Sequence, residues 1–197
     1  MPRQVDHQQR RTLVARALWR VIAEQGLEAA SLREVAAAAG VSIGQLQHYF
    51  GSKESMLRFT IEQLAEETGG RILNLAAAGG PVLDVLRRVV AELVPSTPER
   101  RIEQSAWTAF LAHSAVDHEI ARILRDQYRA SRAVLEQSLR HAQAAGEVGP
   151  SVDPGVAAAT LLALVDGLSI QAELDDLDPA LIDHALDAHF ARLREAP

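Results

Sequence analysis

Proline and glycine divide this chain into long uninterrupted stretches, and their spacing constrains the fold more than any other feature. The eight prolines fall at positions 2, 81, 95, 98, 150, 154, 179 and 197, so none interrupts residues 3–80. Between these breaks Ala and Leu dominate, β-branched and aromatic residues are sparse, and the apolar–polar alternation typical of strands is absent. The chain is therefore predicted to be all-α.

Signals for helix starts and stops predict about nine helices. Ser31-x-x-Glu34 and Ser42-x-x-Gln45 have the pattern of a capping box, in which the first and fourth residues each satisfy a backbone N–H of the other. The pair Gly69-Gly70 lies within the fourth helix and is interpreted either as a hinge or as a helix end at residue 68. The expected helices cover about 7–25, 31–39, 42–50, 52–78, 81–94, 97–113, 116–145, 154–174 and 179–194.

Composition excludes several kinds of protein. The 197 residues are 48% hydrophobic and 23% charged, a balance that rules out wholesale disorder. The absence of cysteine excludes a disulfide scaffold, a thiolate metal site and a cysteine nucleophile. The longest apolar run, 156–165, is too short to span a bilayer, and the first residues lack the apolar core of a signal peptide. A cytoplasmic protein is therefore expected.

Charge is distributed unevenly along the chain. The net charge is −6, but residues 1–53 carry seven basic and four acidic side chains, a net charge of +3, and the remainder has a net charge of −9. A basic first quarter on an acidic body suggests that this end meets a polyanion. Chance fluctuation explains the asymmetry about equally well.

Residues 31–50, SLREVAAAAGVSIGQLQHYF, have the spacing of a helix-turn-helix. Ala36 is small enough for a second helix to pack over it, and Gly40 can take the positive φ of a tight turn. Leu46 can hold the second helix on the first. An ordinary helical hairpin would satisfy the same spacing, so the motif alone leaves both alternatives open.

The second of these helices leaves polar side chains free for a nucleic acid. Gln45, Gln47 and His48 lie at outward positions and can hydrogen-bond base edges in a major groove. Gly44 allows close backbone approach, and Lys53 lies at a helix N-terminus, where charge and backbone N–H groups attract phosphate. The inner positions are apolar, namely Val35, Val41, Leu46 and Phe50.

The stretch GVSIGQLQHYFGSKESML, residues 40–57, closely resembles the signature of TetR-type transcriptional repressors. In that family Gly-Val begins the turn, a Tyr/His-Phe pair ends the recognition helix, and a Ser-Lys-Glu/Asp triplet begins the fourth helix. LVARALWRVIAEQGLEAASLREVAAAAG, residues 13–40, resembles the first two helices, so the likeness covers about residues 8–68. WTAFLAHS (107–114) and LVDGLSIQ (164–171) loosely resemble the choline-responsive subgroup.

The resemblance implies a homodimeric repressor that binds a palindromic DNA operator and is released by a small molecule. It implies a DNA-binding domain over 1–51 and an effector-binding and dimerisation domain over 52–197. The alternative is a regulator of the same fold that activates transcription or senses no ligand. Carried over by position, the base-facing or groove-facing residues are Ser42, Ile43, Gly44, Gln45, Gln47 and His48, and the phosphate-contacting residues are Ser31, Tyr49 and Lys53.

Three positions prevent the family's base preference from being copied. Gln47 stands where the family often has Tyr, and His48 stands where it has another aromatic residue or Arg. Gln45 can cap Ser42 instead of contacting a base.

The segment 156–165 is apolar on all sides, as in a helix that packs on its own chain with one face and on a second copy with the other. A central helix buried in a monomer is the alternative. Together with the last helix, the segment predicts a dimer face containing Leu161, Leu164, Leu168, Leu181, Ala185 and Ala188.

A ligand pocket is expected where the scarce aromatic residues gather in the middle helices of the body. Ordinary core packing explains each of these residues at least as well. The candidates are Met56, Phe59, Trp107, Phe110 and Tyr128, with Gln104 and His113 as polar anchors.

Enzyme and metal motifs are not found. The sequence has no phosphate-binding glycine loop, no nucleophile elbow and no HExxH, so no enzymatic activity, cofactor or metal is predicted. His184 and His189 are five residues apart, about 140° around a helix, which is poor ligand geometry. Asp175, Asp176 and Asp178 are interpreted as a solvated loop and a helix cap.

Overall fold

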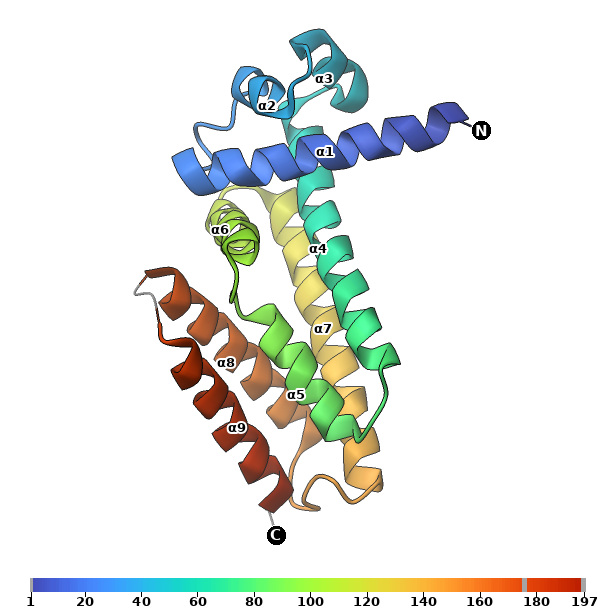
Figure 1. Cartoon of the computed structure of the whole chain (residues 1–197), viewed down its shortest axis with the longest axis vertical. Helices are drawn as coiled ribbons and strands as arrows, with labels where there is room; N and C mark the ends of the chain where they lie inside the picture. The colour runs from blue at the N-terminus through green and yellow to red at the C-terminus, as the bar shows by residue number, and fades with distance from the viewer. Residues whose placement is uncertain (1, 175–176, 196–197) are drawn as a thin grey trace. The chain divides into compact units, whose positions relative to one another are not determined.

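The computed structural model describes residues 2–174 and 177–195, and these residues form nine α-helices and no strand (Figure 1). The all-α prediction is confirmed for this part of the chain. The helices are α1 (Pro2–Gln25), α2 (Leu32–Ala39), α3 (Ile43–Phe50), α4 (Lys53–Ala77), α5 (Val82–Leu93), α6 (Pro98–His113), α7 (His118–Ala144), α8 (Pro154–Leu174) and α9 (Pro179–Glu195).

Apart from the start of α1, every predicted helix boundary lies within two residues of the observed one. α1 begins at Pro2, five residues before the predicted start at His7. No helix-breaking residue lies between these positions, and proline is tolerated at the first position of a helix because its missing N–H has no partner there anyway.

Side-chain caps set the later helix starts. α7 begins two residues after its predicted start because Oδ1 of Asp117 accepts the backbone N–H of Glu119 at 2.9 Å and that of Ile120 at 3.1 Å. The predicted Asp-Pro starts of α8 and α9 are confirmed in the same way, with Asp153 capping α8 and Asp178 capping α9.

The chain divides into two compact units that do not follow the sequence order. One unit comprises the chain up to Glu67 together with Arg101–Leu124, and the other comprises Thr68–Arg100 together with the chain from Arg125 onward. Helices α4, α6 and α7 therefore each supply residues to both units. The predicted domain boundary between residues 51 and 52 stays a prediction.

The first unit packs on one face of α1. The apolar stripe of α1, formed by Val14, Ala17, Leu18, Val21 and Ile22, is buried. Beside it, the Trp19 indole N–H donates to the Thr60 carbonyl oxygen at 3.3 Å. This bond ties α1 to α4 and satisfies a polar group inside the core. The other helices of the unit complete the core with residues that include Ala36, Leu46, Ile61, Phe110 and Ile123.

The second unit has its own core, built from α5, α7, α8 and α9. Its largest fully buried side chains include Leu83, Leu139, Leu161, Leu186 and Phe190. Within this unit α8 and α9 run antiparallel, side by side (Figure 1). Burial of these residues, at roughly 25 cal/mol per Å² of apolar surface, is the main stabilising contribution that we assign to the unit.

The start of α5 depends on a distant side chain. Pro81 makes no side-chain cap, and the carboxylate of Glu147 instead accepts the backbone N–H of Val82 at 3.1 Å and that of Leu83 at 2.8 Å. A carboxylate is favoured at this position because the helix N-terminus carries partial positive charge.

The pair Gly69-Gly70 lies inside α4, which continues without interruption to Ala77. The interpretation of this pair as a helix end at residue 68 is therefore wrong. A Cβ added at either glycine would meet no atom within 4 Å. Packing therefore does not require glycine there, and the hinge interpretation stays a prediction.

One face of α8 is not covered by its own unit. Among the described residues, only α8 is long and apolar enough to span a membrane by length and composition, with a mean hydropathy of 1.5, yet 39% of that window is buried. The apolar run in the sequence stops at Asp166, whereas the helix continues to Leu174. The large hydrophobic side chains exposed on α8 are Val156, Ile170 and Leu174.

Candidate nucleic-acid interface and ligand groove

The turn between α2 and α3 has the predicted helix-turn-helix geometry. Gly40 adopts φ +66°, and its N–H donates to the Ala37 carbonyl oxygen at 3.2 Å. The N–H of Val41 donates to the Ala36 carbonyl oxygen at 3.0 Å. This pattern is a helix C-cap that favours glycine, because a side chain strains the backbone in the left-handed region.

The second helix of the motif is held by its inner face and by its cap. Ala36 is 2% exposed and Leu46 is 0% exposed, so α3 packs on α2 as predicted. Ser42 and Gln45 form a complete capping box, with the Gln45 N–H donating to Ser42 Oγ at 3.1 Å and the Ser42 N–H donating to Gln45 Oε1 at 2.9 Å. At Ser31 only one half of the predicted box forms, in which the hydroxyl accepts the Glu34 N–H.

The predicted DNA-contacting residues lie at the surface of α3 and of the segments that flank it. The capping bond occupies the side-chain oxygen of Gln45 and leaves its amide nitrogen available. Exposure alone does not test contact with DNA, so these assignments stay predictions. The exposed residues are Ser31, Ser42, Ile43, Gly44, Gln45, Gln47 and His48, and the half-buried residues are Tyr49 and Lys53.

The N-terminus of α4 follows directly and presents Lys53 as its first residue. Ser52 caps this helix by accepting the Ser55 N–H at 3.1 Å. Backbone hydrogen bonding at the helix start, helped by the Ser52 hydroxyl, lowers the pKa of Glu54. The same N–H groups that favour this carboxylate also favour a phosphate oxygen.

One residue that positions α3 was missed at the level of sequence. The Arg11 guanidinium lies 4.0 Å from the ring centroid of Phe59 and 5.1 Å from that of Phe50, the last residue of α3. The two rings are 5.5 Å apart. A cation over two aromatic faces links α1, α3 and α4. The available signal was the place of Arg11 three residues before Val14 and seven before Leu18, on the helix face that carries the buried apolar residues.

The residues predicted to line a ligand pocket are divided between the two units. Met56 and Phe110 are 0% exposed and belong to the core of the first unit, which Phe59 and Trp107 cover from outside. Tyr128 belongs to the second unit. The two remaining candidates, Gln104 and His113, are half-buried in the first unit.

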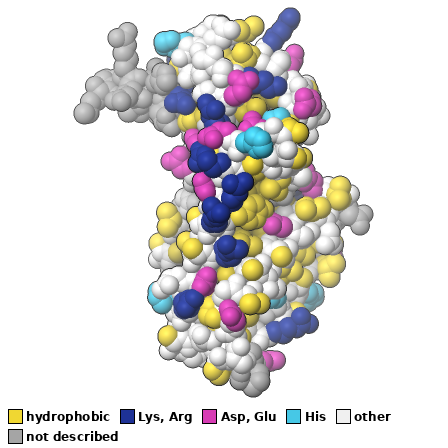
Figure 2. All heavy atoms as spheres, turned by 180° about the vertical axis from the view of Figure 1, so that it is seen from behind, with side chains coloured by type: hydrophobic (Ala, Val, Ile, Leu, Met, Phe, Trp, Pro, Cys, Tyr) yellow, Lys and Arg dark blue, Asp and Glu magenta, His cyan; other side chains and the backbone are white. Residues whose placement is uncertain are grey.

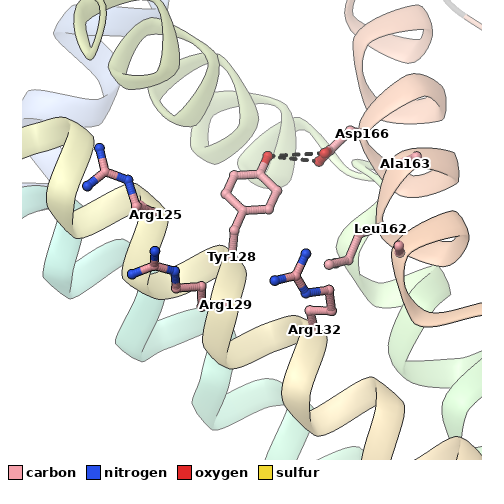
Figure 3. A pocket seen from close by; sticks show the side chains of 8 residues that line it. Arg125, Tyr128, Arg129, Arg132, Leu162, Ala163 and Asp166 are labelled. Carbon is pink, nitrogen blue, oxygen red and sulfur yellow. Dashed lines mark hydrogen bonds between the residues drawn. The ribbon is translucent and has the colours of Figure 1, made fainter. Parts of the chain in front are cut away.

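A groove of about 390 Å³ lies between α7 and α8 in the second unit (Figure 3). Tyr128 points from α7 toward Asp166 on α8, and its hydroxyl lies 3.1 Å from each carboxylate oxygen. Burial raises the pKa of Asp166, and the hydrogen bond from Tyr128 opposes part of this shift. The other lining residues are Arg125, Arg129, Arg132, Ala159, Leu162 and Ala163.

A smaller hollow of about 250 Å³ lies in the first unit and is lined in part by Lys53 and His113. The His113 Nε2 atom is 3.9 Å from Oδ2 of Asp117, a contact across the α6–α7 turn. In the described residues no group of three His, Asp or Glu side chains could hold a metal ion. Asp175 and Asp176 lie outside the described residues.

The predicted dimer-face residues differ in their burial within one chain. Leu161 and Leu168 lie in the core of their own unit, Leu164 and Ala185 are partly buried against it, and Leu181 and Ala188 are exposed. Hydrophobic side chains also appear at the surface between basic and acidic ones (Figure 2). The predicted face stays a prediction, and its two exposed members, Leu181 and Ala188, both lie on α9.

Two family models match this chain. The model described as "Bacterial regulatory proteins, tetR family" matches residues 15–59, which include the helix-turn-helix. The model described as "BetI-type transcriptional repressor, C-terminal" matches residues 82–195, more than half of the chain.

Known proteins agree with these matches along nearly the whole chain. The HTH-type transcriptional regulator PksA of Bacillus subtilis is 35% identical over 179 residues, which cover 89% of this chain and 84% of that protein. The crystal structure of a transcriptional regulator from Rhodococcus sp. Rha1 has a TM-score of 0.82 at 32% identity, covering 95% of this chain and 99% of that one.

A regulator from Saccharomonospora viridis, crystallised with choline, has a TM-score of 0.83 over 93% of this chain and 96% of that one. At 23% identity this likeness shows a shared fold.

Proposed function

Because the chain belongs to the TetR family of transcriptional regulators, we propose that it is a homodimeric repressor that binds a palindromic operator and is released by a small molecule. The observation that carries the proposal is α3, which buries Leu46 and leaves Gln47 and His48 exposed on a capped, rigid helix. Such a helix can enter a major groove and present polar side chains to base edges.

The N-terminus of α4 supports the proposal from the side of the DNA backbone. Lys53 and the first N–H groups of α4 offer charge and hydrogen-bond donors to a phosphate next to the groove that α3 reads. Ser31 and Tyr49 are the further proposed phosphate contacts. A regulator that binds chromosomal DNA acts in the cytoplasm of a bacterium, which is the location we propose.

The uncovered face of α8 supports the homodimer. Val156 and Ile170 are 64% and 45% exposed in a single chain, although both side chains are fully apolar. A second copy would bury such a face, and two copies related by a twofold axis would present two α3 helices to the two halves of a palindrome.

Release by a small molecule is the most specific part of the proposal. The choline complex of the Saccharomonospora protein supports ligand binding by this fold, without indicating the ligand of this chain. The predicted pocket residues of the first unit stay a prediction, and Tyr128, which belongs to the second unit, is not among them.

An electrophoretic shift assay with the DNA upstream of the protein's own gene tests the proposal. The purified chain should retard this DNA and should leave a scrambled fragment of equal length unretarded. Equal retardation of both fragments, or of neither, would contradict specific operator binding.

The substitution Lys53→Ala is expected to weaken binding to all DNA sequences alike. Loss of one phosphate contact should flatten the slope of log K against log salt by about one unit, because about one fewer counterion is released. Gln47→Ala should leave this slope unchanged and should alter preference at one operator position by about 1–3 kcal/mol. Fluorescence anisotropy over a salt series measures both quantities. A uniform loss of affinity in both variants would refute the assignment of Gln47 to a base.

Replacement of both Gly69 and Gly70 by alanine is expected to stabilise the chain by about 2 kcal/mol, because each glycine inside a helix costs about 1 kcal/mol relative to alanine. Added methyl groups would meet no neighbour at either position. If the pair is a hinge, the stiffer helix should also change the effector concentration that releases DNA. Thermal unfolding and operator release measure the two effects separately. Stabilisation without any change in release would remove the hinge from the proposal.

A further inference from the structure

The groove between α7 and α8 is lined by three positively charged side chains of α7. Arg125, Arg129 and Arg132 lie on one side of α7, spaced by four and three residues. Arg129 pairs with Asp126, at 3.7 Å and with both side chains more than half exposed. Within the described part of the chain, Arg125 and Arg132 form no ion pair. Guanidinium groups of this kind bind carboxylates through paired hydrogen bonds.

Apart from Asp166, the opposite wall of the groove is apolar. Ala159 and Ala163 lie one turn apart on α8, and their small side chains leave open the space beside Leu162. Figure 3 shows the Arg132 guanidinium directed into the gap between the helices, next to Leu162. Ala163 is seven residues from both Val156 and Ile170, so this wall adjoins the face of α8 that we assign to the second copy. A ligand with a carbon skeleton can lie along this edge of α8 while its charged group faces α7.

Asp166 has hydrogen-bonding capacity that the bond from Tyr128 does not use. The Tyr128 hydroxyl lies 3.1 Å from both Asp166 oxygens but has a single proton to donate. A carboxylate can accept about four hydrogen bonds. Because Asp166 is half-buried, it gains from a further donor that a ligand brings, such as a hydroxyl or an ammonium group.

From these three observations we propose that the groove binds a small organic acid that also carries hydroxyl or amino groups. Its carboxylate pairs with Arg132, its skeleton lies on Ala159 and Ala163, and a donor group reaches Asp166. A purely cationic ligand is disfavoured, because three guanidinium groups repel it and one carboxylate attracts it. That the acid acts as an effector rests on the proposed function; that it binds does not.

Isothermal titration of the full chain without DNA tests this proposal with three probes. Gluconate carries a carboxylate and hydroxyls, hexanoate carries a carboxylate only, and choline carries a positive charge. Gluconate should bind saturably, hexanoate should bind more weakly because it offers Asp166 no donor, and choline should not compete for the groove. Failure of gluconate to bind, or displacement of gluconate by choline, would overturn the proposal.

Two variants locate the binding in this groove. Arg132→Gln should weaken gluconate binding about tenfold to a hundredfold, the effect of losing a charge-assisted hydrogen bond. The matched control Arg140→Gln removes an arginine that pairs with Glu136 outside the groove, and it should leave gluconate binding unchanged. Both side chains are exposed, so folding should be unaffected. Equal effects of the two variants would overturn the proposal.

Two further measurements separate the proposal from its competitors. Asp166→Asn should abolish the preference for gluconate over hexanoate without removing binding of the carboxylate. Sedimentation of Arg132→Gln distinguishes a ligand groove from an interface between copies. A change in the dimer dissociation constant with unchanged gluconate binding would assign the groove to the second copy and overturn the proposal. Operator binding of the same variants reports on the proposed function independently, because the titration contains no DNA.

Discussion

Ile170→Asp is expected to convert the protein into a monomer and to abolish operator binding. Ile170 is 45% exposed on the uncovered face of α8, so one chain tolerates the change, whereas a dimer would bury an unpaired carboxylate. That burial costs about 3–5 kcal/mol, and a twofold interface contains the substitution twice. Operator affinity should then fall by roughly a hundredfold or more, because a monomer contacts one half-site.

Sedimentation velocity and fluorescence anisotropy measure the two effects of this substitution. Leu73→Asp is the matched control, since Leu73 is 70% exposed but lies on α4. It should remain dimeric and should retain operator binding. If Ile170→Asp also sediments as a dimer, the two copies do not meet through α8. Leu161, which is also among the residues predicted for the dimer face, is unsuitable for this test. It is fully buried in its own chain, where a carboxylate would destabilise the fold.

Leu46→Ala should detach the recognition helix from the rest of the first unit. Leu46 is 0% exposed and is the main apolar contact of α3 at the motif, so its truncation should cost about 2–5 kcal/mol. Because α3 has eight residues, it is too short to remain helical without this packing. Thermal unfolding should show the destabilisation, and specific operator binding should be lost.

Ile43→Ala provides the comparison within the same helix. Ile43 is 44% exposed, so its truncation should change the free energy of unfolding little. Its effect should instead be a modest loss of operator affinity, as expected for an apolar contact in the groove. Equal destabilisation by the two substitutions would contradict the assignment of inner and outer faces on α3.

Local signals predicted the helices well because each start is decided within a few residues. Asp153, Asp178 and Ser42 cap their helices through their own side chains, and this chemistry can be inferred from sequence. The same holds for Gly40, whose left-handed conformation follows from its place after a short helix. Pro81 placed the start of α5 within one residue, but the cap of this helix could not be predicted from local sequence, because it is the carboxylate of Glu147, 65 residues away.

The candidate sites were harder to predict because they depend on which helix faces are covered. An apolar periodicity on α8 does not distinguish Leu161, which faces its own core, from Ile170, which does not. Composition grouped Trp107, Phe110 and Tyr128 as one aromatic cluster, but the fold assigns Tyr128 to a different unit. The groove between α7 and α8 could not be predicted from sequence spacing, because its residues come from two helices that are separated along the chain.

The discontinuous first unit restricts how this regulator can be recombined with others. Its core contains Phe110, Ile120 and Ile123, which come from a segment that follows α5. A hybrid regulator made by joining residues 1–67 to a foreign sensor would leave the matching surfaces of α1 and α4 without these partners. A functional chimera therefore needs three junctions, near residues 67, 100 and 124. The first unit then keeps both of its segments while the second unit is exchanged.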